Sequence, residues 1–315
     1  MATADQLPPA ISNPSVQNPH ALAQKISDEF HARQKIANDP TLDADISILE
    51  KASTDTPSDA LLFTALSYCY SIKGNLKAIE DNARKAYALS PTDTTTGLMY
   101  ALSLKMNKQP LRALEVVRKM ATIHPHPISV EYMLATLEVL TQKYPEAIAI
   151  LETLKIRLGS SATKGDELAF DYLLITCYLY TGDYAKAEEF LKAGIASLPH
   201  AALYWGLLGE IYLKSGDMDK ADEALDKAIS LGPNGPSSLY YKGIVLQKQN
   251  MPELANEAFE KTYNSEKPML RQNGEDYYLM YQICQKLSKK DEAEQYRKEA
   301  ADLSFTYEVP WKVKQ

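Results

Sequence analysis

The chain has 315 residues, of which 45% are hydrophobic and 24% are charged, so its composition is that of a folded protein and excludes wholesale disorder. With 34 basic and 41 acidic side chains it carries a net charge of −7, which argues against the broad positive field of a general nucleic-acid binder. Length alone predicts about two globular domains, or one elongated domain.

Residues 1–19 contain four prolines among small and polar residues. Such a segment has too few large apolar side chains to bury a core, so we expect a flexible N-terminal tail. It has no basic stretch followed by an apolar core and therefore does not resemble a secretory signal. No stretch approaches 18 consecutive apolar residues, which excludes a membrane-spanning helix. These features predict a cytoplasmic protein.

From His20 onward the apolar residues follow helical spacing, with short breaks at Gly, Pro and Asn and no sustained alternation of period two. An all-α fold follows. One stretch, residues 205–233, carries a dense pattern of large and small residues: Trp205-x2-Leu208-Gly209-x2-Tyr212, then Gly216-Asp217, then Ala221-x3-Leu225-x2-Ala228, and finally Leu231-Gly232-Pro233.

This pattern resembles the tetratricopeptide repeat (TPR), departing mainly at Leu225, where the family prefers Phe. The small residue at Ala221 has apparent equivalents along the chain at Ala44, Ala78, Ala113, Ala147, Ala187, Ala255 and Ala293. Successive members of the full series are 34, 35, 34, 40, 34, 34 and 38 residues apart. The two excesses predict insertions at residues 157–167 and 264–273, the first being either a flexible loop or a second contact site.

Each period reads as a helical hairpin, and a hairpin cannot bury its own apolar face unless its neighbours stack on it. We therefore expect one array over residues 20–304, made of about seven clear hairpins and a degenerate first one. The resemblance implies a right-handed α-solenoid of stacked helical hairpins, a TPR-like superhelix. Residues 305–315 form either a C-terminal cap or a tail; three aromatic side chains there favour a cap, because they are costly to leave in water.

Motifs for catalysis are mostly missing. No glycine-rich phosphate loop is present, and the Ser161-x2-Lys164 pair lies in an insertion without the companion motifs of acyl-transfer enzymes. His124 and His126 flank a helix-ending proline with no acidic or cysteine ligand at metal spacing. The three cysteines, Cys69, Cys177 and Cys284, are far apart in sequence and are expected to be reduced and buried. We expect no enzyme, no cofactor and no metal.

A surface remains as the candidate site. In TPR proteins, a stripe beside the apolar face of each first helix lines the concave groove that holds partner peptides. The residues assigned to this groove here are aromatic or apolar, and five of the eight are tyrosines: Tyr68, Leu98, Leu102, Tyr132, Tyr172, Leu179, Tyr240 and Tyr278. The Lys/Asn/Arg set with which one TPR subclass grips chaperone tails is absent from these places. A tyrosine offers a large contact area plus a hydroxyl, which suits a protein interface.

Two readings of this stripe stay open. Either it binds an extended or helical segment of a protein partner, or its rings pack against the neighbouring hairpin. At the level of function, a non-enzymatic scaffold or adaptor is the leading hypothesis. The alternative is a structural subunit of a larger assembly or a self-associating solenoid, whose groove is filled by its own tail or by another copy.

Overall fold

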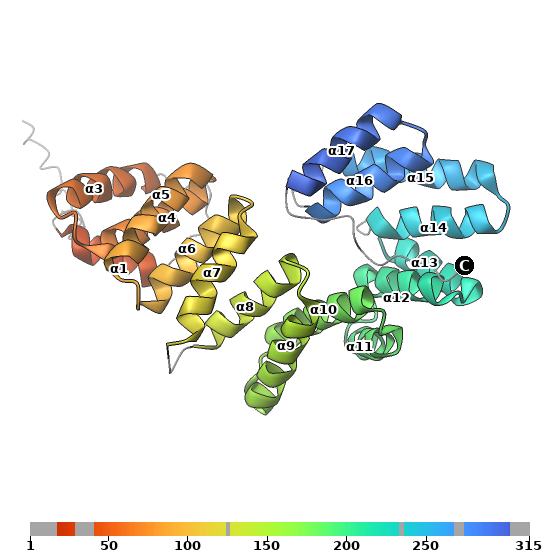
Figure 1. The fold of residues 1–315 in the computed structure, drawn as a ribbon, viewed down its shortest axis with the longest axis horizontal. Coiled ribbons are helices and arrows are strands. Elements are labelled where there is room, and N and C mark those ends of the chain that lie inside the picture. The colour runs from red at the N-terminus through yellow and green to blue at the C-terminus, as the bar shows by residue number, and fades with distance from the viewer. Residues whose placement is uncertain (1–17, 29–40, 124–126, 233–235, 268–273, 303–315) are drawn as a thin grey trace, which may run out of the picture. The chain divides into compact units, whose positions relative to one another are not determined.

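The computed structural model describes residues 18–28, 41–123, 127–232, 236–267 and 274–302 (Figure 1). Within these ranges the chain is helical and contains no strand, which confirms the all-α prediction. The expected N-terminal tail up to residue 17, the expected cap or tail at 305–315, the turn at 124–126 and most of the second insertion lie outside the described residues.

The contacts divide the chain into two compact units, Met1–Val130 and Glu131–Gln315. The first unit contains α1 (Pro19–Asp28), α3 (Leu42–Asp55), α4 (Ala60–Lys73), α5 (Leu76–Leu89), α6 (Thr94–Met106) and α7 (Pro110–Ala121). Here α4 packs on α5 and α6 on α7, while α1 lies against both α3 and α4. The contact between α5 and α6 joins successive hairpins, so the core of this unit runs from one hairpin into the next.

The second unit holds most of α8 (Ile128–Leu140), which begins at the division. The rest are α9 (Tyr144–Leu158), a 3-10 turn (Gly159–Ser161), α10 (Lys164–Thr181), α11 (Tyr184–Ser197), α12 (Ala202–Ser215), α13 (Met218–Leu231), α14 (Pro236–Lys248), α15 (Pro252–Glu266), α16 (Gly274–Lys286) and α17 (Lys290–Asp302). Even-numbered helices from α4 onward are the first helices of the hairpins; odd-numbered helices from α3 onward are the second helices. Each second helix from α9 onward also packs on the following first helix.

A shared backbone bond fixes the register of the second helices. The amide of the fourth helical residue donates to the carbonyl of the residue just before the helix, at Asp45, Ile79, Ala113, Ala147, Ala187, Ala221, Ala255 and Ala293. These residues are all buried and lie 34, 34, 34, 40, 34, 34 and 38 residues apart. Ala44 is exposed and Ala78 only half-buried, so assigning the place to them is wrong by one residue. One residue turns a helix by about 100°, which is enough to move a side chain off the buried face.

The turn inside each hairpin also repeats. Five residues before the shared position the backbone is left-handed, with positive φ at Gly74, Lys108, Gln142, Gly182, Gly216, Asn250 and Ser288. Glycine adopts this conformation without steric cost, whereas other residues pay for it. Four of the seven turns therefore have a non-glycine residue there, and of these only Asn250 is of a type that often adopts the conformation.

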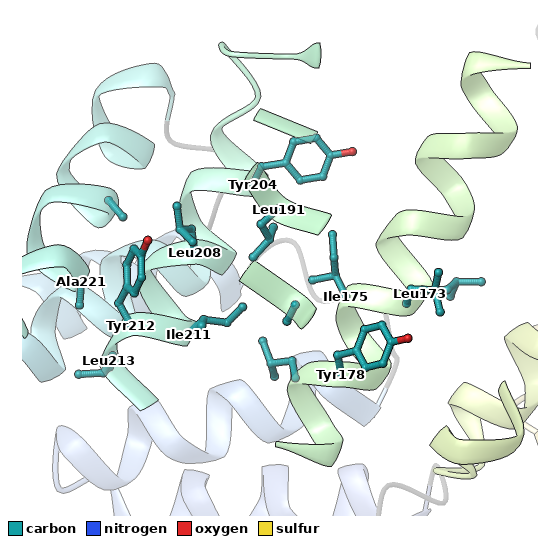
Figure 2. Packing of buried hydrophobic residues seen from close by; sticks show 14 of the residues in the cluster. Leu173, Ile175, Tyr178, Leu191, Tyr204, Leu208, Ile211, Tyr212, Leu213 and Ala221 are labelled. Atoms are coloured by element: carbon teal, nitrogen blue, oxygen red, sulfur yellow. The ribbon is translucent and has the colours of Figure 1, made fainter. Parts of the chain in front are cut away.

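The buried cluster of the second unit joins α9 to α14, with side chains of α10, α11 and α12 at its centre (Figure 2). Helices α12 and α13 approach closely because residue 209 is glycine. A Cβ built on Gly209 would lie 2.5 Å from Cγ of Leu225 and 3.3 Å from the carbonyl oxygen of Ala221. The small residue of the TPR pattern is thus explained by contact with the next helix of the same hairpin.

The insertion at residues 157–167 is not a plain loop. Helix α9 extends to Leu158, a 3-10 turn follows, and α10 begins at Lys164. The start of α10 is fixed by a capping box: the Thr163 hydroxyl accepts from the Asp166 amide, while the Asp166 carboxylate accepts from the Thr163 amide at 3.0 Å. Its extra residues mainly lengthen the two flanking helices, so the flexible-loop interpretation is wrong.

Candidate partner-binding surface

The predicted groove residues lie on six first helices and differ widely in exposure. In the first unit, Tyr68 of α4 is buried, while Leu98 and Leu102 of α6 are half-buried. Burial of Tyr68, followed by the charge of Asp93, raises the pKa of its hydroxyl. In this part of the stripe, Leu98 and Leu102 are therefore partly accessible and Tyr68 is not.

Two of the predicted residues in the second unit are core residues. Leu179 of α10 belongs to the central cluster, and Tyr240 of α14 is only 4% exposed. The Tyr240 ring packs on Phe259 with centroids 5.8 Å apart and meets Tyr241 edge-on at 5.3 Å. Burial is the main reason why its pKa is raised. Because Phe259 lies on α15, the second helix of the same hairpin, these ring contacts lie within Tyr240's own hairpin, whereas the packing alternative placed them against the neighbouring one.

The remaining three predicted residues reach the surface to different degrees. Tyr132 of α8 is half-buried, with its ring centroid 5.6 Å from that of Phe170. Tyr278 of α16 is also half-buried and lies 5.9 Å from Tyr281 of the same helix. Tyr172 of α10 is 41% exposed, which makes it the most accessible member of the stripe.

Two further exposed apolar side chains lie on the neighbouring first helices, on the helix face that corresponds to the face of Tyr172 on α10. Leu203 of α12 is 46% exposed and precedes Gly206, the equivalent of Tyr172 on that helix, by three residues. Leu140 of α8 is 41% exposed and follows Thr136, the equivalent of Tyr68 on that helix, by four. Spacings of three and four place residues on one helix face. We call Leu140, Tyr172 and Leu203 the first-helix surface. Neither leucine was predicted, because only the positions equivalent to Tyr172, Tyr68 and Leu179 were considered on each first helix, although the same spacing rule predicts them.

Exposed apolar side chains also occur on second helices. Leu111, Ile156 and Leu254 are 55%, 82% and 51% exposed. Single exposed apolar residues are common on protein surfaces and need no functional explanation. Exposure by itself therefore does not select the binding face; the first-helix surface differs in having an exposed apolar side chain on the corresponding helix face of three successive first helices of one unit.

An ion pair interrupts the stripe on α12, at the position equivalent to Tyr68 of α4. Glu210 of α12 is buried and forms an ion pair with Lys214, one turn further along the same helix. Burial lowers the pKa of Lys214, against the opposing effect of Glu210. The Lys214 ammonium also lies 6.0 Å from the centroid of the Tyr241 ring. This buried polar cluster was not predicted, since an acidic residue on a solvent-facing stripe ordinarily stays in water.

Tyrosine has a further structural role between hairpins. In three places a first-helix tyrosine donates its hydroxyl to a glutamate on the preceding second helix: Tyr70 to Glu50, Tyr178 to Glu152, and Tyr212 to Glu188. The distances are 2.6 Å for Tyr178 and 2.9 Å for Tyr212. Burial, and then the bond to Glu188, raise the pKa of Tyr212 to about 12. Phenylalanine could not make this bond, which accounts for part of the tyrosine excess.

The described residues show no assembled chemical site. Cys69, Cys177 and Cys284 are in no disulfide and are fully buried, as predicted, and burial raises the pKa of Cys177 to about 12 and of Cys284 to about 11. Within the described ranges no group of His, Cys, Asp or Glu side chains is arranged to hold a metal ion. In the same ranges no helix is long and apolar enough to cross a membrane.

Comparisons with known proteins bear on this architecture. Residues 172–236 match the family model described as tetratricopeptide repeat. No curated protein matches the sequence. Among solved structures, a tetratricopeptide repeat protein from Parabacteroides merdae is 14% identical, with a TM-score of 0.60 covering 77% of this chain and 92% of that one.

Two further structures share the fold. YrrB, described as a TPR protein with an unusual peptide-binding site, is 21% identical, with a TM-score of 0.51 over 62% of this chain and 97% of its own. The apo form of the quorum sensor NprR from B. thuringiensis is 13% identical, with a TM-score of 0.56 over 90% and 99%. Identities this low establish the fold alone. With the repeat match over residues 172–236 and the recurring hairpin geometry, the chain contains tetratricopeptide repeats and has the fold of TPR proteins, with no subfamily assigned.

Proposed function

We propose that this protein is a non-enzymatic scaffold or adaptor that binds a segment of a protein partner on its first-helix surface. The observation that supports it most is the set of exposed apolar side chains, Leu140, Tyr172 and Leu203, on the corresponding face of three successive first helices. Apolar side chains that recur along one face suit an extended or helical segment, which needs anchor contacts at intervals.

YrrB, a protein of similar fold, is described as a TPR protein with an unusual peptide-binding site, which supports peptide binding as the class of function for this chain. Of the eight groove residues predicted from the sequence, we keep Leu98, Leu102, Tyr132, Tyr172 and Tyr278 as contact residues, since each is at least partly accessible. Tyr68, Leu179 and Tyr240 are retained as supports beneath the surface. The cytoplasmic location stays a prediction.

Comparative affinity capture tests this proposal. The tagged full chain is compared with the double variant Tyr172→Ala/Leu203→Ala and with the control Ile156→Ala, which removes an exposed apolar side chain from a second helix. We expect proteins enriched by the wild type to be lost with the double variant and kept with the control. Equal capture by all three chains, or loss with the control alone, would contradict the assignment. Circular dichroism and melting confirm that each variant is folded.

The alternative function is a structural subunit or a self-associating chain. It predicts that the purified protein sediments above its monomer mass of 35.1 kDa and that the sedimentation coefficient rises with protein concentration. The same Tyr172→Ala/Leu203→Ala variant separates the two proposals, because the scaffold proposal expects a monomer with or without these side chains. An oligomer abolished by the double variant would favour self-association.

A further inference from the structure

A polar hollow lies on the first unit. It has a volume of about 430 Å³ and is bounded by α1, α4 and the start of α6. This volume falls within the roughly 300–1,000 Å³ of pockets that hold small ligands or side chains. Two residues of α4 line it: Tyr68, a predicted groove residue, and Thr64, at the position equivalent to Tyr172. Ser27, Asp28, Asp93 and Thr96 line it as well. The hollow thus belongs to the face on which TPR proteins bind partners.

Two threonine hydroxyls in this hollow have already used their hydrogens. Thr64 Oγ1 donates to the carbonyl oxygen of Ala60 at 2.9 Å, and Thr96 Oγ1 donates to that of Ser90 at 2.7 Å. A threonine hydroxyl has a single hydrogen but two lone pairs. Both oxygens therefore remain able to accept a hydrogen bond, while neither has a hydrogen left to donate to a ligand.

Two carboxylates add negative charge. Asp28 accepts from the side-chain amide of Gln24 at 2.8 Å through Oδ1, and Asp93 accepts from the Thr96 amide at 2.9 Å through Oδ1. Each carboxylate can accept further bonds. None of the described residues that line the hollow is Lys, Arg or His, so no cation on these walls balances the two charges.

One wall group has an unsatisfied polar atom. The Oγ atom of Ser27 is buried and makes no hydrogen bond in the described part of the chain. Buried polar atoms in native proteins are nearly always bonded, and an unsatisfied one requires an explanation. An incoming donor at this wall would supply the missing partner.

We propose that this hollow binds the arginine side chain of a partner segment. A guanidinium carries five N–H donors in a planar fork and no acceptor, which complements walls that present carboxylates and hydroxyl lone pairs. A lysine ammonium, with its three donors at one point, would satisfy fewer of these separated acceptors. The inference deepens the proposed function by giving the chemistry of one residue in the bound segment, and it rests on that function.

The test uses N-acetyl-arginine N-methylamide as the probe, titrated into the full chain labelled at threonine methyl groups and followed by NMR at low salt. The matched neutral probe is the citrulline analogue, which has the same length and shape. Thr64→Ser and Thr96→Ser assign the two reporter signals. We expect a saturable shift of both signals with the arginine probe and none with the citrulline probe.

Charge variants complete the test. Asp28→Asn and Asp93→Asn each remove one charge, and asparagine at 93 keeps the N-cap of α6. Each should weaken the arginine probe about fivefold, the size expected when a charge-assisted hydrogen bond at a partly open site becomes neutral. Asp81→Asn, which removes a charge from second helix α5, is the control and should leave the affinity unchanged.

Three results would overturn the inference: no saturable shift with arginine, an equal shift with citrulline, or unchanged affinity in both hollow variants. These outcomes are separable from those of the capture experiment. If capture depends on Tyr172 and Leu203 but the arginine probe does not bind, the proposed function stands and the arginine site is wrong. If the probe binds but capture does not depend on these two residues, the first-helix surface is the part that fails.

Discussion

The left-handed turn shared by the hairpins makes an unusual stability prediction: introducing glycine should stabilise this protein. At the turn between α6 and α7 the left-handed residue is Lys108, with φ of 61°. The equivalent residue between α12 and α13 is Gly216, with φ of 91°. Lys108 is exposed and forms no ion pair within the described residues, so Lys108→Gly changes the backbone preference with little loss of side-chain contact.

The expected magnitude is a difference of two terms. A non-glycine residue in the left-handed region costs about 1–2 kcal/mol. Glycine loses about 0.5–1 kcal/mol more than alanine in conformational entropy on folding. Lys108→Gly should therefore raise the free energy of unfolding by about 0.5–1 kcal/mol. Gly216→Ala should lower it by a similar amount, because the added Cβ meets no neighbouring atom within 4 Å and only the backbone term changes.

Equilibrium unfolding in guanidinium chloride, followed by circular dichroism, measures both effects. Repeat arrays need not unfold in two states, so the curves are fitted with a nearest-neighbour model in which one hairpin's intrinsic stability changes. We expect the midpoint to rise for Lys108→Gly and to fall for Gly216→Ala. A lower midpoint for Lys108→Gly would refute the shared turn geometry at that hairpin.

Three other outcomes follow from the packing. Gly209→Ala should cost about 1–3 kcal/mol of stability, because the new Cβ would lie 2.5 Å from Leu225; unfolding curves that match the wild type would show that the helices separate freely. Tyr212→Phe removes the bond to Glu188 and should cost about 1 kcal/mol at neutral pH. The folded pKa of Tyr212, about 12, lies above its ordinary value near 10, so this stability is present below pH 10 and declines as pH rises toward 12. The free energy of unfolding of Tyr212→Phe should therefore fall less steeply between pH 10 and pH 12 than that of the wild type. Parallel pH profiles for the two proteins would argue against the bond. Cys177 should resist a thiol reagent at pH 8 until the chain unfolds, and rapid labelling of the native protein would contradict its burial.

Much of the architecture is readable from the sequence because the repeat has a fixed length. Ala113, Ala147, Ala187 and Ala221 occupy the small-residue place as predicted. The error in the first two hairpins arose because alanine stands one residue before the true position, which is occupied there by Asp45 and Ile79. Residue type alone favours the alanine, whereas the true position is the fourth residue of the helix and depends on where the helix begins.

The candidate surface was less predictable. Spacing along one helix gives the direction of a side chain, but not what the neighbouring helices place against it. Tyr172 and Tyr240 hold equivalent stripe places, yet Tyr172 is 41% exposed and Tyr240 packs on Phe259. The left-handed turns at Lys108 and Gln142 were missed for a related reason, since neither residue type indicates positive φ.

The most direct test of the central claim places a photo-crosslinking benzophenone amino acid at position 172 or, as the control, at position 156 of the full chain. Both positions are exposed, the first on a first helix and the second on a second helix. After irradiation with captured partners, we predict that position 172 crosslinks a segment of another protein and that position 156 does not. Crosslinking from position 156 alone, or from position 172 only to the chain's own residues, would contradict partner binding on the first-helix surface.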